Sequence, residues 1–380
     1  MSVRLPADGP ARLALLMGSN PLPNYLAAAI LQPRAIVLVY TPETMEPRDR
    51  LREVLATRWP SLQIDSVCID DATDPRMVRD ACSQLEVDHL HYSGGTKPMA
   101  VHSRRALRVD DGHASYLDER RGLLRFDDGY QIDLSRCDLG LSLDVLLQLH
   151  GIERRVSKPS EGGPTPSDLD DISRWVRAQP ERAQMLYDTL LPEGKLRSFT
   201  LAKTEPWSPA QHGLALSVDR IPGDGWNRAR HERWSKFVAG GWLERWIADL
   251  VRSRLGEAPP NIEVSVNCKR TRPSPAEFEI DVALVRGHRL YVISCTTAQK
   301  KGLCKSKLFE VAMRARQMGG DLARSALVCL AEDSSTVRAD IASIWDAPNV
   351  PRVFGVMDLR EWAGDSSTPN TGSLEEWLDS

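Results

Sequence analysis

Apolar runs alternate with helical patterns over the first 150 residues. Strand-like runs, separated by helical stretches of roughly 10 to 15 residues, occupy 12–17, 35–40, 62–69 and 87–92. Continuous apolar strands of this kind are typical of a parallel sheet that is buried on both faces. The segment 114–119 then predicts a strand, and 121–134 predicts a hairpin that turns at Asp127-Asp128-Gly129. The pattern indicates a Rossmann-like, doubly wound α/β domain that closes with antiparallel strands.

Pro, Gly and Ser interrupt this pattern between Ser157 and Pro166, which predicts a linker. We therefore expect a first domain over 1–155 and a linker with a mainly helical connector over 156–235. A second α/β domain is expected over 236–380. Its predicted elements are a helix at 240–255, strands at 262–270, 278–287 and 289–297, a helix around 308–317 and a strand at 325–331.

Composition limits the class of protein. A length of 380 residues, at roughly 150 per domain, predicts two to three domains. No window resembles a membrane span and the first residues do not resemble a secretory signal, so we expect a soluble, cytoplasmic protein without a membrane partner. The seven cysteines are scattered, which predicts reduced thiols rather than disulfides or a zinc site.

The first candidate site is the sequence HYSGGTKPMA at 91–100, where a predicted strand ends and a helix begins. Glycines allow close approach of a ligand, the free N–H groups of a helix start favour anions, and Lys97 adds a positive charge. Phosphate binding by Ser93, Gly94, Gly95, Thr96 and Lys97 is one interpretation. A Gly-Gly turn beside a solvated lysine is the other.

A second loop, GSNPLPN at 18–24, also follows a strand and opens a helix. In open parallel sheets, ligands bind beyond the carboxyl ends of strands where the strand order reverses. We therefore expect the two loops to face one crevice, with Ser19, Asn20 and Asn24 binding sugar or base edges. The alternative is that Asn20 and Asn24 only cap the helix.

Together, the two loops resemble those of the CARF domain, the CRISPR-associated Rossmann fold that senses cyclic oligoadenylate. The resemblance covers about residues 10–150, and the strand followed by SGGTK-x-M is its most specific part. It implies a homodimer that binds cyclic tetra-adenylate across its two-fold axis. It assigns phosphate or ribose contacts to 93–97, adenine or ribose contacts to Ser19 and Asn20, and a third contact to Thr41.

The second constellation comprises Glu244 on a predicted helix and Glu279 and Asp281 on a predicted strand. This is the order of a PD-(D/E)xK nuclease core, in which carboxylates hold a divalent metal that activates water. The carboxyl half resembles the restriction-endonuclease-like domain fused to CARF domains in cyclic-oligoadenylate-activated nucleases. That resemblance implies Mg²⁺ or Mn²⁺ bound by Asp281, Glu279 and Glu244. However, Ser294-Cys295-Thr296-Thr297 stands where such domains have Glu-Cys-Lys-Thr.

Two accounts of that loss are open. In one, the function has migrated to the next helix, with Glu310 as the carboxylate and Lys305 or Lys307 as the positive charge. In the other, the nuclease core is degenerate, and the protein is a ligand-regulated module that binds nucleic acid or a protein. A third hypothesis, that the sensor domain degrades its own ligand, depends on His91 as the base near Lys97.

Charge is unevenly distributed around this constellation. The formal net charge is only −3, but Lys and Arg greatly outnumber acids between 286 and 324, and acids outnumber them from 325 onwards. A basic segment beside a nuclease-like core favours binding of RNA or DNA backbones without strong sequence specificity. Trp234, Trp242 and Trp246 recur at helical spacing and predict a buried apolar stripe.

Overall fold

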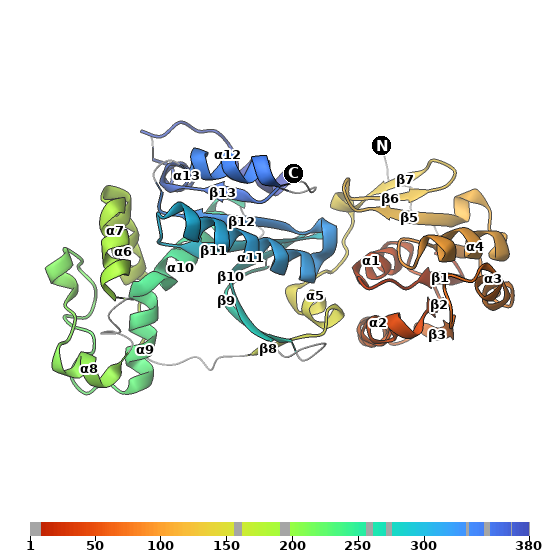
Figure 1. Ribbon diagram of the computed structural model, residues 1–380, viewed down its shortest axis with the longest axis horizontal. Coiled ribbons are helices and arrows are strands. Elements are labelled where there is room, and N and C mark those ends of the chain that lie inside the picture. The colour runs from red at the N-terminus through yellow and green to blue at the C-terminus, as the bar shows by residue number, and fades with distance from the viewer. Residues whose placement is uncertain are drawn as a thin grey trace.

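The computed structural model describes residues 9–155, 162–190, 198–255, 261–270, 276–331, 334–345, 350–365 and 367–379. Two α/β domains lie side by side, and a group of helices stands at the far end of the second domain (Figure 1). The helix α5 (Leu143–Leu149) lies between the two domains in this view. Of the described residues, no helix is both long enough and apolar enough to cross a membrane.

The first domain is a seven-stranded sheet in the order β3-β2-β1-β4-β5-β6-β7, with the first five strands parallel and the last two antiparallel. Its strands are β1 (Arg12–Leu16), β2 (Ala35–Tyr40), β3 (Gln63–Cys68), β4 (His89–His91), β5 (Ala114–Asp118), β6 (Leu123–Phe126) and β7 (Gln131–Asp133). Its helices are α1 (Leu22–Leu31), α2 (Met45–Arg58), α3 (Pro75–Ser83) and α4 (Lys97–Leu107). The predicted doubly wound sheet and its terminal hairpin are confirmed.

The side chains of β1 alternate between the two faces of this sheet, because successive residues of a strand point to opposite sides. Leu13 and Leu15 pack with α1 and α2, whereas Ala14 and Leu16 pack with α3 and α4. Both faces are therefore dry, and for this reason the strand appears in the sequence as an uninterrupted apolar run.

The second domain is a six-stranded sheet in the order β13-β12-β11-β10-β9-β8. Its strands are β8 (Ile152–Arg155), β9 (Asn261–Arg270), β10 (Ala276–Arg286), β11 (Arg289–Thr296), β12 (Arg324–Cys329) and β13 (Arg352–Phe354). The helices beside it are α10 (Trp242–Leu255), α11 (Lys301–Gly319), α12 (Ser335–Ile344), α13 (Val356–Trp362) and α14 (Ser373–Asp379). On β11, Val292 faces α11, and Ile293 faces α10 and α13.

A continuous apolar core joins the two domains through α5. Leu146 and Leu147 of this helix belong to the same buried cluster as Leu13 of the first sheet and Val292 of the second. The strand β8, which follows α5 directly, pairs with β9. The second sheet therefore contains one strand from before the predicted linker, and residues 156–161 of that linker lie outside the described residues.

The connector is helical, as the sequence predicts. It contains α6 (Pro166–Ala178), α7 (Pro180–Leu190), α8 (Phe199–Thr204) and α9 (Arg228–Lys236), and a π-helical turn (Phe237–Gly241) leads from α9 into α10. Trp234, Trp242 and Trp246 are buried in the cluster that also holds Ile293, which confirms the predicted apolar stripe.

Candidate functional site

The two glycine-bearing loops lie against each other at the switch point of the first sheet. β1 and β4 are parallel neighbours, and from here the sheet continues to β2 on one side and to β5 on the other. A Cβ on Gly18 would lie 3.3 Å from the amide nitrogen of Gly95, and one on Gly94 would overlap the carbonyl oxygen of Leu16. The two loops meet at the carboxyl ends of β1 and β4, and the close approach of their backbones explains the glycines.

The amino-terminal end of α4 lies at the place where the two loops meet. Gly95 has a φ of +76°, a left-handed conformation that favours glycine. The Thr96 hydroxyl accepts a hydrogen bond from the Met99 amide (3.3 Å) and thereby caps the helix. Lys97 is exposed, and none of the described residues forms an ion pair with it. The first turn of α4 contains no acid, so the positive charge at this helix end is uncompensated.

The other predicted ligand contacts differ in how free their polar atoms are. The Ser93 hydroxyl accepts a hydrogen bond from the Leu117 amide (2.5 Å), so it holds the loop to β5. Thr41 is buried after β2, and its backbone N–H donates to the Thr44 hydroxyl (2.9 Å) at the start of a short 3₁₀ turn. Ser19 is exposed beside Gly18. Ser19, Thr96 and Lys97 are thus exposed, and the hydroxyls of Ser93 and Thr96 shape the loop.

Asn20, in the loop at 18–24, contacts the second domain. Its Oδ1 lies 3.2 Å from Nε2 of His150, the residue that follows α5, and accepts a hydrogen bond from the Leu22 amide (3.1 Å). Its side-chain nitrogen lies directly against Gly320, at the end of α11. Close by, the Asp321 amide donates to Glu119 of the first domain (3.2 Å). The sequence contains no sign of this contact, because it joins residues 300 positions apart.

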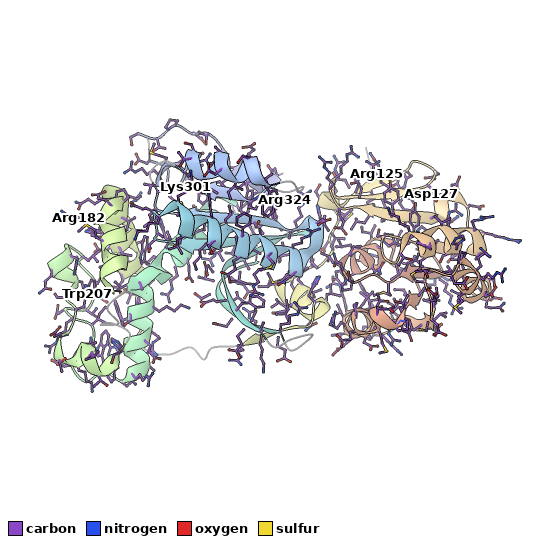
Figure 2. The ribbon with its side chains drawn as sticks, viewed as in Figure 1. Arg125, Asp127, Arg182, Trp207, Lys301 and Arg324 are labelled. Carbon is purple, nitrogen blue, oxygen red and sulfur yellow. The ribbon has the colours of Figure 1, made fainter. Side chains whose placement is uncertain are left out.

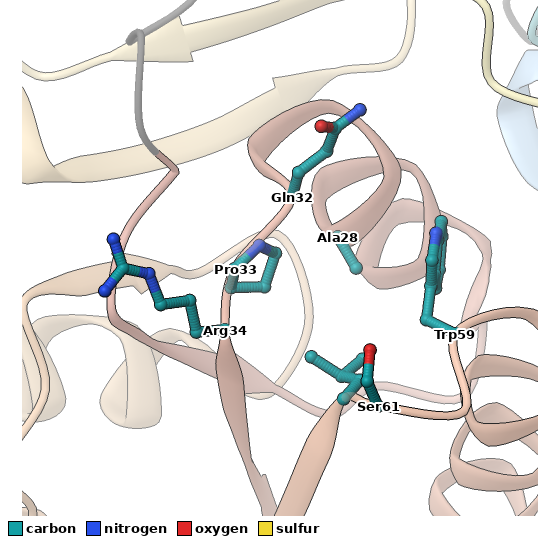
Figure 3. A pocket seen from close by; sticks show the side chains of 7 residues that line it. Ala28, Gln32, Pro33, Arg34, Trp59 and Ser61 are labelled. Carbon is teal, nitrogen blue, oxygen red and sulfur yellow. The ribbon is translucent and has the colours of Figure 1, made fainter.

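A hollow of about 450 Å³ lies at the opposite, amino-terminal edge of the same sheet. It is lined by the end of α1 and the segments that enter β2 and β3, including Gln32, Arg34 and Trp59 (Figure 3). It contains none of the predicted ligand-binding residues. A second hollow of about 590 Å³, between α12, β13 and α13, contains none of the predicted catalytic residues.

Asp281 is the centre of the second constellation. It lies on β10 between β9 and β11, flanked by the register pairs Ile280–Val266 and Val282–Ile293. Its Oδ2 accepts hydrogen bonds from the Cys295 amide (2.7 Å) and the Ser294 hydroxyl (3.0 Å). Burial raises the pKa of Asp281, while these hydrogen bonds and the charge of Lys307 oppose the rise. Ser294 therefore touches Asp281 from the position where the motif has glutamate.

Glu244 enters the same place from α10. It is 9% exposed and accepts a hydrogen bond from the hydroxyl of Ser265. Burial raises its pKa to about 7, and the charges of Asp281 and Glu279 act in the same direction. Ser265 has a φ of +52°, a strained conformation for a residue other than glycine. Sequence reasoning missed Ser265, because no spacing rule links a strand serine to the helix glutamate.

Glu279 is the third carboxylate, and it forms an ion pair with Lys236 at the end of α9. Its charge acts on both Glu244 and Asp281, so the three carboxylates form one electrostatic cluster. We call Glu244, Glu279 and Asp281 the acidic cluster. In the described residues, no group of three or more His, Cys, Asp or Glu side chains has the geometry of a metal site.

The replacement candidates on α11 lie in different places. Lys305 pairs with Asp340 of α12 (2.7 Å), which directs it away from the acidic cluster. Lys307 is close enough for its charge to lower the pKa of Asp281 and of the Cys295 thiol. Glu310 is exposed, and no described residue of the acidic cluster forms a hydrogen bond or ion pair with it.

The basic segment around α11 is partly neutralised by its neighbours. Lys301 also pairs with Asp340 (2.5 Å), and Arg316 pairs with Asp321 (3.2 Å). Arg324 is 6% exposed, donates to the carbonyl oxygen of Leu322 (3.2 Å), and has a pKa lowered to about 10 by burial. Lys301 and Arg324 lie in the second domain (Figure 2). The charge excess in the sequence therefore does not correspond to one open basic face.

The chain matches no family model and no curated protein sequence. Solved structures do match it. Can2 from Sulfobacillus thermosulfidooxidans, in complex with cyclic tetra-adenylate, superposes with a TM-score of 0.70 at 16% identity, over 97% of this chain and 99% of Can2. This chain has the Can2 fold.

Two further structures agree with that result. VC1899 from Vibrio cholerae superposes with a TM-score of 0.69 at 14% identity, over 97% of this chain and 98% of VC1899. A type III CRISPR defence DNA nuclease activated by cyclic oligoadenylate superposes with a TM-score of 0.52 at 20% identity, over 88% of this chain and 48% of that nuclease. These likenesses concern the fold alone, and they confirm the predicted arrangement of two α/β domains with a helical connector.

Proposed function

We propose that this protein is a nuclease of type III CRISPR defence that cyclic tetra-adenylate activates and that requires Mg²⁺ or Mn²⁺. Its substrate is RNA or DNA, cut without strong sequence specificity. The observation that carries the proposal is that Glu244, Glu279 and Asp281 lie near enough to influence one another electrostatically, beside Ser294. These three carboxylates come from a helix and a strand of a fold shared with Can2 over nearly its whole length.

The activator is proposed to bind where the loops at 18–24 and 92–97 meet. Lys97 and the amino-terminal end of α4 supply positive charge for phosphates, and Ser19 supplies a neutral partner for sugar or base. The side chain of Asn20, in contrast, is held by His150 and by the Leu22 amide. The family resemblance implies a homodimer, in which one such loop from each subunit would contact the ligand.

The described side chains of the acidic cluster do not have the geometry of a metal site. A divalent cation bound there would nevertheless offset the burial and mutual repulsion that raise the pKa of Glu244 and of Asp281. Asp281, Glu244 and Glu279 would hold it. When bound, such a cation lowers the pKa of a water molecule and neutralises charge on the phosphate. The Cys295 amide and the Ser294 hydroxyl fix the orientation of Asp281.

The test is incubation with cyclic tetra-adenylate, Mn²⁺ and labelled single- and double-stranded RNA and DNA. We expect cleavage that needs both ligand and metal and that disappears in Asp281→Asn, while that variant still binds the ligand. Absence of cleavage in every combination would contradict the proposal.

A ligand-regulated binding module with a degenerate core is the second candidate function. Ser294 and Thr296 in place of the usual Glu and Lys favour it, as does the lack of a three-ligand metal geometry in the described residues. It predicts ligand-dependent binding of labelled RNA or DNA, with no cleavage and no change in melting temperature on addition of Mn²⁺.

A further inference from the structure

The acidic cluster lacks the lysine that its motif normally supplies from the neighbouring strand. Thr296 occupies that position, is 6% exposed, and accepts a hydrogen bond from the Ala298 amide (3.2 Å). A buried threonine that is already paired with nearby backbone cannot supply a charge to a phosphate.

Lys236 brings a cation to the same place from a different part of the chain. Its Nζ forms an ion pair with Glu279, and its charge also lowers the pKa of Glu244. It therefore acts on two of the three carboxylates. Lys305 forms an ion pair with Asp340, whereas the charge of Lys307 lowers the pKa of Asp281.

The fold holds Lys236 in this position through its neighbours. Trp234 and Phe237 are buried on either side of it, and their rings lie edge to face at 6.0 Å. The π-helical turn that follows leads directly into α10, which carries Glu244. The side chain of Lys236 itself is 51% exposed, so it lies at the surface of the protein.

We infer that Lys236 is a catalytic residue that contacts the scissile phosphate and replaces the missing lysine of the motif. This role rests on the proposed nuclease function. It makes the helical connector part of the active site, because Lys236 of α9 supplies the positive charge that Thr296 of β11 does not. A lysine at this point contributes through positive charge on the phosphate as negative charge develops there.

The test compares Lys236→Met, Lys236→Arg and Lys203→Met with the parent protein, using cyclic tetra-adenylate, Mn²⁺ and labelled RNA and DNA. Lys203, an exposed lysine on α8 of the same connector, is the matched control. We expect Lys236→Met to lose cleavage on the order of a hundredfold, mainly in kcat. Lys236→Arg should retain part of the activity, and Lys203→Met should equal the parent. Ligand affinity and melting temperature should not change.

Unchanged or faster cleavage by Lys236→Met would overturn the inference while leaving the nuclease function intact. Faster cleavage would identify the ion pair with Glu279 as inhibitory. Equal losses in Lys236→Met and Lys236→Arg, together with lower melting temperatures, would also overturn it in favour of a structural role. An inactive parent would overturn the nuclease function, and this role with it.

Discussion

At the residue scale, the two sites differ in how their charges are compensated. Lys97 is exposed without an ion-pair partner among the described residues, and the acidic cluster places the buried Glu244 near the half-buried Asp281 and the exposed Glu279. The exposed Lys97 is nearly neutral for folding, whereas the buried carboxylate of Glu244 is costly. Such groups are typical of binding and catalytic sites.

Replacing Lys97 tests the first site. Charge-assisted hydrogen bonds to phosphate contribute roughly 1.5–3 kcal/mol, so Lys97→Ala should weaken binding of cyclic tetra-adenylate about tenfold to a hundredfold. The melting temperature should hardly change, because the side chain is exposed. Isothermal titration measures the affinity, and Arg105→Ala at the other end of α4 is the control for net charge. Equal affinities for all three proteins would mean that this loop does not contact the ligand.

Replacing Glu244 tests the second site through pH. The pKa of Glu244 is raised to about 7 from its ordinary 4.5, so the folded protein keeps a proton that the unfolded chain has released. The free energy of unfolding of the parent should therefore fall, through this group, as the pH rises from about 4.5 to about 7. Glu244→Gln retains an oxygen acceptor for Ser265 and avoids this loss.

Urea titrations at both ends of that pH range measure the effect. The variant should match the parent at the acidic end and be more stable at the alkaline end, while its cleavage activity is lost. Glu205→Gln, at an exposed glutamate, should follow the parent throughout. A variant that is less stable than the parent at alkaline pH would show that the Glu244 charge has a stabilising partner.

At the scale of elements, the β1–α1 and β4–α4 loops form one unit, because their backbones are in contact. Gly94→Ala would place a Cβ against the Leu16 carbonyl and within 2.7 Å of the Gly18 amide. Backbone atoms cannot move aside cheaply, so we expect a loss of a few kcal/mol, of the order seen for overpacking, together with loss of ligand binding.

Gly302→Ala is the matched control for this change. Gly302 lies in α11, and a Cβ at this position would have no atom of the described residues within 4 Å beyond its own helix backbone. Alanine should therefore leave stability unchanged or raise it by about 1 kcal/mol. Thermal melts of both variants, with and without cyclic tetra-adenylate, check the pair. Similar melting temperatures for both would disprove the close packing of the two loops.

At the scale of the whole molecule, a buried histidine, His288, and a half-buried one, His150, lie where the domains meet. His150 contacts Asn20, and a Cβ on Gly122 of the first domain would lie 2.6 Å from Nε2 of His288 in the second domain. Burial lowers the pKa of each to about 4, so both are neutral in the folded protein at neutral pH. Their contribution to stability is present above the ordinary histidine pKa of 6.5 and is lost as the pH falls towards 4.

We therefore expect the melting temperature to fall between about pH 6.5 and pH 4, more gradually in His288→Asn than in the parent. The groups that face His288 include Asp133, which favours its charged form, and Arg289 and Arg324, which oppose it. Calorimetry across this range measures the slope. Identical slopes for the two proteins would mean that His288 titrates alike in the folded and unfolded states.

The sequence by itself determined the sheet of the first domain, the helical connector and the second α/β domain. It did so because the central strands of the first sheet are buried on both faces and the core helices carry apolar stripes, and such patterns are local. It also placed the loops at 18–24 and 92–97 at the same end of the sheet, since the carboxyl ends of adjacent parallel strands meet there.

Only the tertiary structure decided which charges meet. The ion pair of Lys236 with Glu279, the Ser265–Glu244 contact and the contact of Asn20 with Gly320 join residues 43, 21 and 300 positions apart. It also decided that β8 belongs to the second sheet and that Asp340 neutralises Lys301 and Lys305. Electrostatic partners depend on distance in space, and periodicity along the chain does not encode the packing of one element on another.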